Sequence, residues 1–86
     1  MSILNESTVR EKLRRFITAE LMRDDSYELG DDEPIFTGGL IGSLEMVQIQ
    51  IYIEDVFGLL VPDPEMTVAR MNTLDQMVTR VLRDQK

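Results

Sequence analysis

Apolar residues at both ends of this chain recur every three or four positions, which is the spacing of one face of a helix. Near the N-terminus these residues are Val9, Leu13, Phe16, Ile17 and Leu21. Near the C-terminus they are Leu74, Met77, Val78, Val81 and Leu82. An apolar helix face has to be buried, so the two segments predict helices packed around a shared core. We expect these helices over residues 8–23 and 74–84.

Each of these segments begins with the sequence of a capping box, in which a Ser or Thr is followed three positions later by Glu or Gln. Thr8 and Glu11 form the first pair, and Thr73 and Gln76 form the second. The pairs predict that the two helices begin at Thr8 and just after Thr73.

The middle segment, residues 43–57, fits two patterns. Residues 47–53 alternate between apolar and polar and are rich in β-branched side chains, which is typical of a strand. Leu44, Val47 and Ile51 also share one helix face, and Ile49, Ile53, Val56 and Phe57 widen it. Ser43 would suit the N-cap of such a helix, and Gly58 its end. The length of the segment favours a helix, but the pattern alone leaves both structures open.

Two irregular stretches separate these elements. Residues 24–42 form a long polar loop with five apolar residues, which we expect to hold it against the core: Leu29, Ile35, Phe36, Leu40 and Ile41. Pro62 and Pro64 interrupt any regular element after the middle segment. A short helix over residues 65–71 is then expected, with weak support from the pattern.

Composition narrows the possible functions. The chain has 86 residues, which suits a single domain over residues 1–86, and it contains neither Cys nor His. Catalytic triads that use His, thiolate metal sites and disulfides are therefore excluded, and we expect no enzymatic activity. No apolar run is long enough to span a membrane, and no signal sequence is recognisable, so a cytoplasmic location is expected.

The charges are unevenly distributed along the chain, whose net charge is −7. Residues 24–66 contain eleven acidic residues and no Lys or Arg, whereas both flanking segments are mildly basic. Such an acidic block attracts positively charged partners and makes nucleic-acid binding a poor prediction. The acidic run that begins at Asp24 does not match a calcium loop, because its glycine is one position late and Ile35 replaces the final Glu. We therefore predict no metal site.

Ser43 is the candidate reactive residue. It follows a glycine-rich segment and would place its hydroxyl at the exposed start of the middle helix. It could be a plain N-cap, or it could be covalently modified. The chain has no His, and no Lys between Lys12 and Lys86, so no nearby base is available to activate the hydroxyl. A reaction at Ser43 would then require another enzyme.

Three motifs follow one another in the middle of the chain: FTGGLIGSL at residues 36–44, EDVFG at 54–58 and VPD at 61–63. In order and spacing they resemble the acyl carrier proteins, which have a Gly-Leu pair, a Ser-Leu at the start of the second helix, an acidic pair before Phe-Gly and a Pro-Asp soon after. The resemblance implies an all-α fold, a small four-helix bundle with a long first loop and a short third helix. It also favours the helix over residues 43–57.

The resemblance further implies that Ser43 carries 4′-phosphopantetheine, attached from coenzyme A by a phosphopantetheinyl transferase with Mg²⁺. The thiol of this arm would hold acyl groups as thioesters for an acyltransferase, ligase or synthase with a basic patch. Partner docking would then involve Leu44, Glu45, Met46, Glu54 and Asp55. The protein is expected to be a monomer and to serve polyketide, other specialised or fatty-acid biosynthesis.

One position departs from the family pattern. An Asp usually precedes the serine, and this chain has Gly42 there. The alternatives are therefore an unmodified, carrier-like adaptor that binds basic partners through its acidic helix face, or a carrier of aminoacyl or peptidyl groups.

Overall fold

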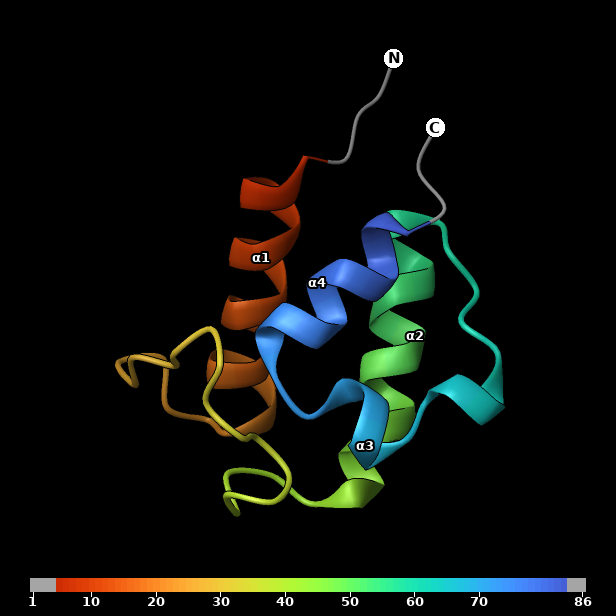
Figure 1. Ribbon diagram of the computed structural model, residues 1–86. Coiled ribbons are helices and arrows are strands. Elements are labelled where there is room, and N and C mark those ends of the chain that lie inside the picture. The colour runs from red at the N-terminus through yellow and green to blue at the C-terminus, as the bar shows by residue number, and fades with distance from the viewer. Residues whose placement is uncertain (1–4, 84–86) are drawn as a thin grey trace.

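The computed structural model describes residues 5–83, and all regular elements in that range are helical (Figure 1). They are α1 (Glu6–Arg15), η1 (Phe16–Leu21), η2 (Ser43–Glu45), α2 (Met46–Phe57), η3 (Asp63–Glu65), α3 (Val68–Met71) and α4 (Leu74–Leu82). The predicted all-α fold is confirmed for these residues. None of their helices is both long and apolar enough to cross a membrane.

Helix α1 begins two residues earlier than predicted. The Asn5 side chain accepts a hydrogen bond from the Thr8 backbone N–H at 2.8 Å, so Asn5 is the N-cap in place of Thr8. Asn caps a helix at least as well as Thr, which explains why the earlier start is preferred. The helix then continues as one π-helical turn, η1, and ends at Leu21 rather than Arg23.

The middle segment, residues 43–57, whose sequence fitted both a strand and a helix, is helical. Ser43–Glu45 form a 3₁₀ turn that leads directly into α2, and the apolar side chains of Ile49 and Ile53 are buried. The N-cap is Gly42, so the prediction of Ser43 at that position was wrong by one residue. Gly58 ends the helix as predicted, in a left-handed conformation (φ 70°) that glycine adopts without strain.

The predicted short helix over residues 65–71 consists of two separate pieces. Met66 and Thr67 have non-helical backbone angles, and they divide η3 from the single turn of α3. The last helix, α4, has the predicted cap: the Thr73 hydroxyl accepts from Gln76 N–H, and the Gln76 side chain accepts from Thr73 N–H, each at 3.1 Å. The predicted end of this helix at Asp84 lies outside the described residues.

The helices enclose one cluster of buried apolar side chains. Figure 1 shows α1 and α2 running in opposite directions, with α4 crossing between them at a tilt. Aromatic stacking of Phe16 on Tyr52, with ring centroids 4.1 Å apart, joins α1 and its π-helical turn to α2. The fully buried side chains of the core come from every part of the fold: Val9, Leu13, Ile17, Ile35, Ile49, Ile53, Val61, Met71, Leu74 and Met77.

The long loop is held against this core, as predicted. Leu29, Ile35 and Ile41 are buried. Asn72, directly after α3, binds the loop through its backbone and its side chain. Its backbone carbonyl accepts from Ile35 N–H at 2.7 Å, and its side-chain oxygen accepts from Phe36 N–H at 2.8 Å. These contacts therefore hold the loop backbone in a defined position before the start of α2.

Candidate functional site

Ser43 lies at the first residue of the 3₁₀ turn that opens the α2 helix, and its side chain is exposed. No residue in the range 5–83 forms a hydrogen bond with its hydroxyl group. An N-cap serine would instead accept a bond from a helix N–H. Ser43 therefore has no capping role here, and its hydroxyl is accessible.

The approach to Ser43 is a tight turn. The Leu40 N–H donates to the Ile35 carbonyl at 3.0 Å, which closes the loop just before the serine. A Cβ atom at Gly38 would lie 2.2 Å from the Pro34 carbonyl oxygen, so this position accepts only glycine. Gly38 thereby allows the backbone to pass close to Pro34 in the turn that precedes Ser43.

Gly42 and Glu45 bracket the serine. The Gly42 N–H donates to Glu45 Oε1 at 3.0 Å. This is one of the two hydrogen bonds of a capping box, and it needs only the backbone of the N-cap residue. Gly42 has a backbone conformation (φ −94°) open to any residue, and an added Cβ would lie 3.3 Å from Glu45 Oε1. An Asp therefore fits at position 42 if the Glu45 side chain moves by a few tenths of an ångström.

An exposed apolar stripe begins next to Ser43. Leu44 is 87% exposed, Val47 58% and Ile51 52%, and their spacing places them on one face of the helix. From the sequence we predicted that these three residues share a broad apolar helix face, with Leu44 as a docking residue. Of the second apolar set, the structure buries Ile49 and Ile53 but leaves Val56 exposed.

The acidic pair Glu54 and Asp55 extends this stripe. Both are exposed and lie three and four positions after Ile51, on the same side of α2. They lie eleven and twelve positions after Ser43, which at 1.5 Å per residue is about 17 Å along the helix, so they are too far away to touch a reacting atom there. Their place suits contact with a partner rather than chemistry.

The other predicted docking residues occupy two different environments. Leu44 and Glu45 lie beside Ser43, and Glu45 is half-buried. Met46 is only 7% exposed and belongs to the core, so it is not part of the outer face of α2. Val47 and Ile51 were missing from the predicted docking set, although their i, i+4 spacing indicated a shared face.

The surroundings of the Ser43 hydroxyl have two opposing effects on a negatively charged group attached there. An anion at Ser43 would lie at the positive end of a long helix, where backbone N–H groups favour negative charge. The carboxylate of Glu45 opposes this effect, and the segment 24–66 contains no Lys or Arg to compensate. Among residues 5–83, no group of acidic side chains is arranged to hold a metal ion.

A hollow of about 250 Å³ lies between the first helix, α1 with η1, and α2, and Ser43 does not line it. Lys12, Arg15, Phe16, Ala19, Glu20 and Tyr52 line it. The Tyr52 hydroxyl donates to the Lys12 carbonyl at 3.1 Å, and burial raises the pKa of this phenol. This hollow belongs to the α1–α2 contact.

No protein-family model matches the sequence, and a search of curated proteins returns no match.

Proposed function

We propose that the protein is an acyl carrier protein in which Ser43 bears 4′-phosphopantetheine. The observation that carries this proposal is the exposed Ser43 hydroxyl, free of bonds from residues 5–83, at the start of an outward-facing apolar and acidic helix face. The choice of 4′-phosphopantetheine as the attached group rests on the resemblance of residues 36–63 to the motifs of acyl carrier proteins. Its thiol would provide the reactive sulfur that this chain, which has no Cys, lacks.

In this proposal Ser43 Oγ attacks the phosphorus atom that bears the pantetheine group within coenzyme A. The pyrophosphate bond of coenzyme A breaks, adenosine 3′,5′-bisphosphate leaves, and the hydroxyl proton passes to a base. The chain has no His, and its charged groups near Ser43 are acids, of which Glu45 is already engaged with Gly42 N–H. The base and Mg²⁺ must therefore come from the transferase. This chain contributes the nucleophile, its exposure and its fixed position.

The face of α2 is the proposed docking surface. We define it as Leu44, Val47, Ile51, Glu54 and Asp55. Three of these residues, Val47, Ile51 and Asp55, follow Ser43 at successive steps of four positions. An apolar centre with acidic residues at one end suits a partner with an apolar contact rimmed by Lys and Arg. The proposed partners are the transferase and the acyltransferase, ligase or synthase that loads the arm.

The test is to incubate the protein with coenzyme A, Mg²⁺ and a broad-specificity phosphopantetheinyl transferase, then to locate any added mass by peptide fragmentation. We expect one phosphopantetheine on Ser43. An unchanged mass, while a control carrier is fully converted, would contradict the proposal. That result would support the alternative of an unmodified adaptor, which rests on Gly42.

A further inference from the structure

A basic hollow adjoins the docking surface of α2. Lys12 and Arg15, together with the stacked rings of Phe16 and Tyr52, line the hollow of about 250 Å³ between the first helix and α2. Tyr52 belongs to α2, and Asp55 of the docking surface lies three positions further along that helix, so these two residues are neighbours on the helix surface. Two patches of unlike charge therefore lie next to each other on one side of the molecule.

The charged groups of both patches have no partner within the described fold. Lys12 and Arg15 are exposed, and their side chains form no hydrogen bond or ion pair with residues 5–83. The same holds for the side chains of Glu54 and Asp55 on the docking surface. Glu20 also lines the hollow, so its lining has two cations and one anion.

Both patches also offer apolar surface to a partner. Leu44, Val47 and Ile51 of the docking surface are more than half exposed, and exposed apolar side chains that share one patch mark a contact with another molecule. The hollow presents Ala19 and the two aromatic rings beside its charges. Each patch thus matches the other in charge and in apolar character.

We propose that two copies of this protein associate weakly and reversibly, with the docking surface of each copy against the basic hollow of the other. Glu54 and Asp55 of one copy then face Lys12 and Arg15 of the second copy. Because the two patches adjoin, a single two-fold axis pairs both at once, which closes the assembly at a dimer. The monomer expected from the sequence is the form at low concentration, and it alone exposes the docking surface to the proposed partner enzymes.

The net charge of −7 opposes contact between two copies. At about 0.15 M salt, however, exposed charges further apart than about 8 Å are largely screened, whereas ion pairs that are partly buried in an interface are screened much less. Local pairing of unlike charges therefore outweighs the long-range repulsion at this ionic strength. We expect a dissociation constant on the order of 0.1 mM, in the range of transient contacts.

The test is sedimentation equilibrium of the full-length, unmodified protein at about 0.15 M salt, from about 10 μM to about 1 mM. We expect a monomer–dimer equilibrium, and on dilution NMR shifts of the backbone amides confined to residues 12–20 and 44–55. No transferase is present, and Ser43→Ala should associate as the unaltered protein does, so the result does not depend on the proposed modification. A protein that stays monomeric over this range, or that assembles beyond a dimer, would overturn the proposal.

Charge reversal identifies the two surfaces. One variant combines Lys12→Glu with Arg15→Glu, and the other combines Glu54→Lys with Asp55→Lys. Each should raise the dissociation constant at least about tenfold, because both patches of a copy then carry the same sign of charge. An equimolar mixture of the two variants should form a mixed dimer about as tightly as the unaltered protein, which also shows that both variants are folded. No recovery in the mixture would contradict the pairing.

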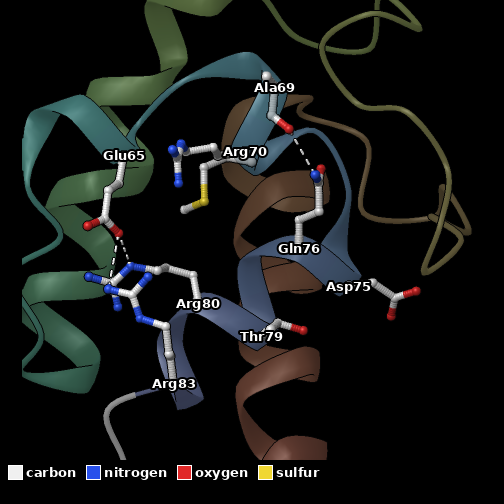
Figure 2. Close-up of a pocket in the computed structure, with 9 residues that line it drawn as sticks. Glu65, Ala69, Arg70, Asp75, Gln76, Thr79, Arg80 and Arg83 are labelled. Atoms are coloured by element: carbon white, nitrogen blue, oxygen red, sulfur yellow. Dashed lines mark hydrogen bonds and ion pairs between the residues drawn. The ribbon is translucent and has the colours of Figure 1, made fainter.

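Arg15→Glu and Arg70→Glu form a matched pair of single variants, because they change the net charge by the same amount. Arg70 is exposed, forms no hydrogen bond or ion pair with residues 5–83, and lines a different hollow, of about 400 Å³, where η3 and α3 meet α4 (Figure 2). Arg15→Glu should raise the dissociation constant several-fold, and Arg70→Glu should leave it unchanged. Equal effects of the two variants would mean that net charge alone governs association, and this would overturn the proposal.

Discussion

Ser43 and Gly42 show how adjacent residues at one helix start can have separate roles. The N-cap position falls on Gly42, whose N–H is bound by Glu45, and this leaves the Ser43 side chain without a capping bond. The sequence indicated that the serine stood at the helix start, but it could not place the cap to within one residue. Helix ends depend on single hydrogen bonds, and several nearby residues can make them.

Gly42→Asp tests the residue that departs from the family pattern. An Asp at the N-cap can accept from helix N–H groups, so we expect the free energy of unfolding to rise by a few tenths of a kcal/mol. We also expect faster modification, because the family's acidic neighbour is part of what the transferase recognises. Urea unfolding and a time course of intact mass measure the two effects.

Gly42→Asn is the matched control, because Asn caps a helix as well as Asp but carries no charge. It should stabilise the helix start to the same degree without the gain in rate. If both variants are modified at the rate of the unaltered protein, the transferase does not read this position.

Asn72 is the residue that binds the loop to the helices. Its side-chain oxygen accepts from the Phe36 and Thr37 backbone N–H groups at 2.8 and 3.1 Å, and its amide donates to the Thr37 hydroxyl at 2.9 Å. We expect Asn72→Ala to lower the free energy of unfolding by about 1–2 kcal/mol, since these donors lose their partner. Asn72→Asp keeps the accepting oxygen and should recover most of the loss. Urea unfolding showing no difference between the two variants would contradict this role.

At the scale of the elements, the two outer helices were predictable because each has one apolar face and a clear start signal. α4 begins as predicted, whereas the first helix begins with Asn5 in place of Thr8 as its cap and ends in a π-helical turn at Leu21. The structure of α2 was harder to predict from the sequence, because α2 has apolar residues on two faces and only one of these faces is buried. Periodicity cannot tell which face meets the core, since that depends on where the long loop and α4 come to lie.

The short pieces between α2 and α4 were predicted least well. The expected helix over residues 65–71 is interrupted at Met66 and Thr67. Pieces of three and four residues have little intrinsic stability, so tertiary contacts decide their limits. One such contact is the pairing of Glu65 with Arg80, fifteen residues away.

The exposed stripe on α2 makes a prediction at this scale. Leu44→Ser combined with Ile51→Ser should raise the transferase KM several-fold at unchanged kcat, because apolar docking contacts are lost. Both side chains are exposed, so the free energy of unfolding should change by less than about 0.5 kcal/mol. Steady-state kinetics and urea unfolding provide the measurements.

Leu60→Ser is the control for this pair, because Leu60 is 65% exposed but lies outside the docking surface. It should leave KM unchanged. A similar rise in KM in Leu60→Ser would mean that the effect comes from general surface apolarity and not from the stripe.

At the scale of the whole molecule, ion pairs connect the acidic middle segment to the basic ends of the chain. Arg10 of α1 binds Asp75 of α4 at 2.7 Å and lies 3.3 Å from Asp31 of the loop. Arg14 also pairs with Asp31 and donates to the Leu29 carbonyl at 3.1 Å. The uneven charge pattern of the sequence thus contributes to the fold as well as to the proposed docking surface, and its role in the fold was not predicted from the sequence.

These contacts predict how stability depends on pH. Hydrogen bonding to Arg80 lowers the pKa of Glu65, and hydrogen bonding to Tyr27 lowers the pKa of Glu33. A lowered pKa in the folded state gives stability that is present above the unfolded value of about 4.3 and is lost as the pH falls further. We expect the free energy of unfolding to decrease below about pH 4.3.

Glu65→Gln should flatten this decrease, because the variant has no carboxylate to protonate at that position. Glu28→Gln is the control, since Glu28 is exposed and forms no ion pair with residues 5–83. Urea unfolding between pH 3 and pH 7 measures the slopes. An equally steep decrease in Glu65→Gln and in the unaltered protein would contradict the role of this pair.

The proposed modification at Ser43 is tested most directly by a comparison of two serine variants. The unaltered protein, Ser43→Ala and Ser26→Ala are incubated in parallel with coenzyme A, Mg²⁺ and transferase, and their intact masses are measured. Both serines are exposed, and Ser26 lies in the long loop. We predict one added phosphopantetheine on the unaltered protein and on Ser26→Ala, and none on Ser43→Ala. Addition to Ser43→Ala would contradict the account.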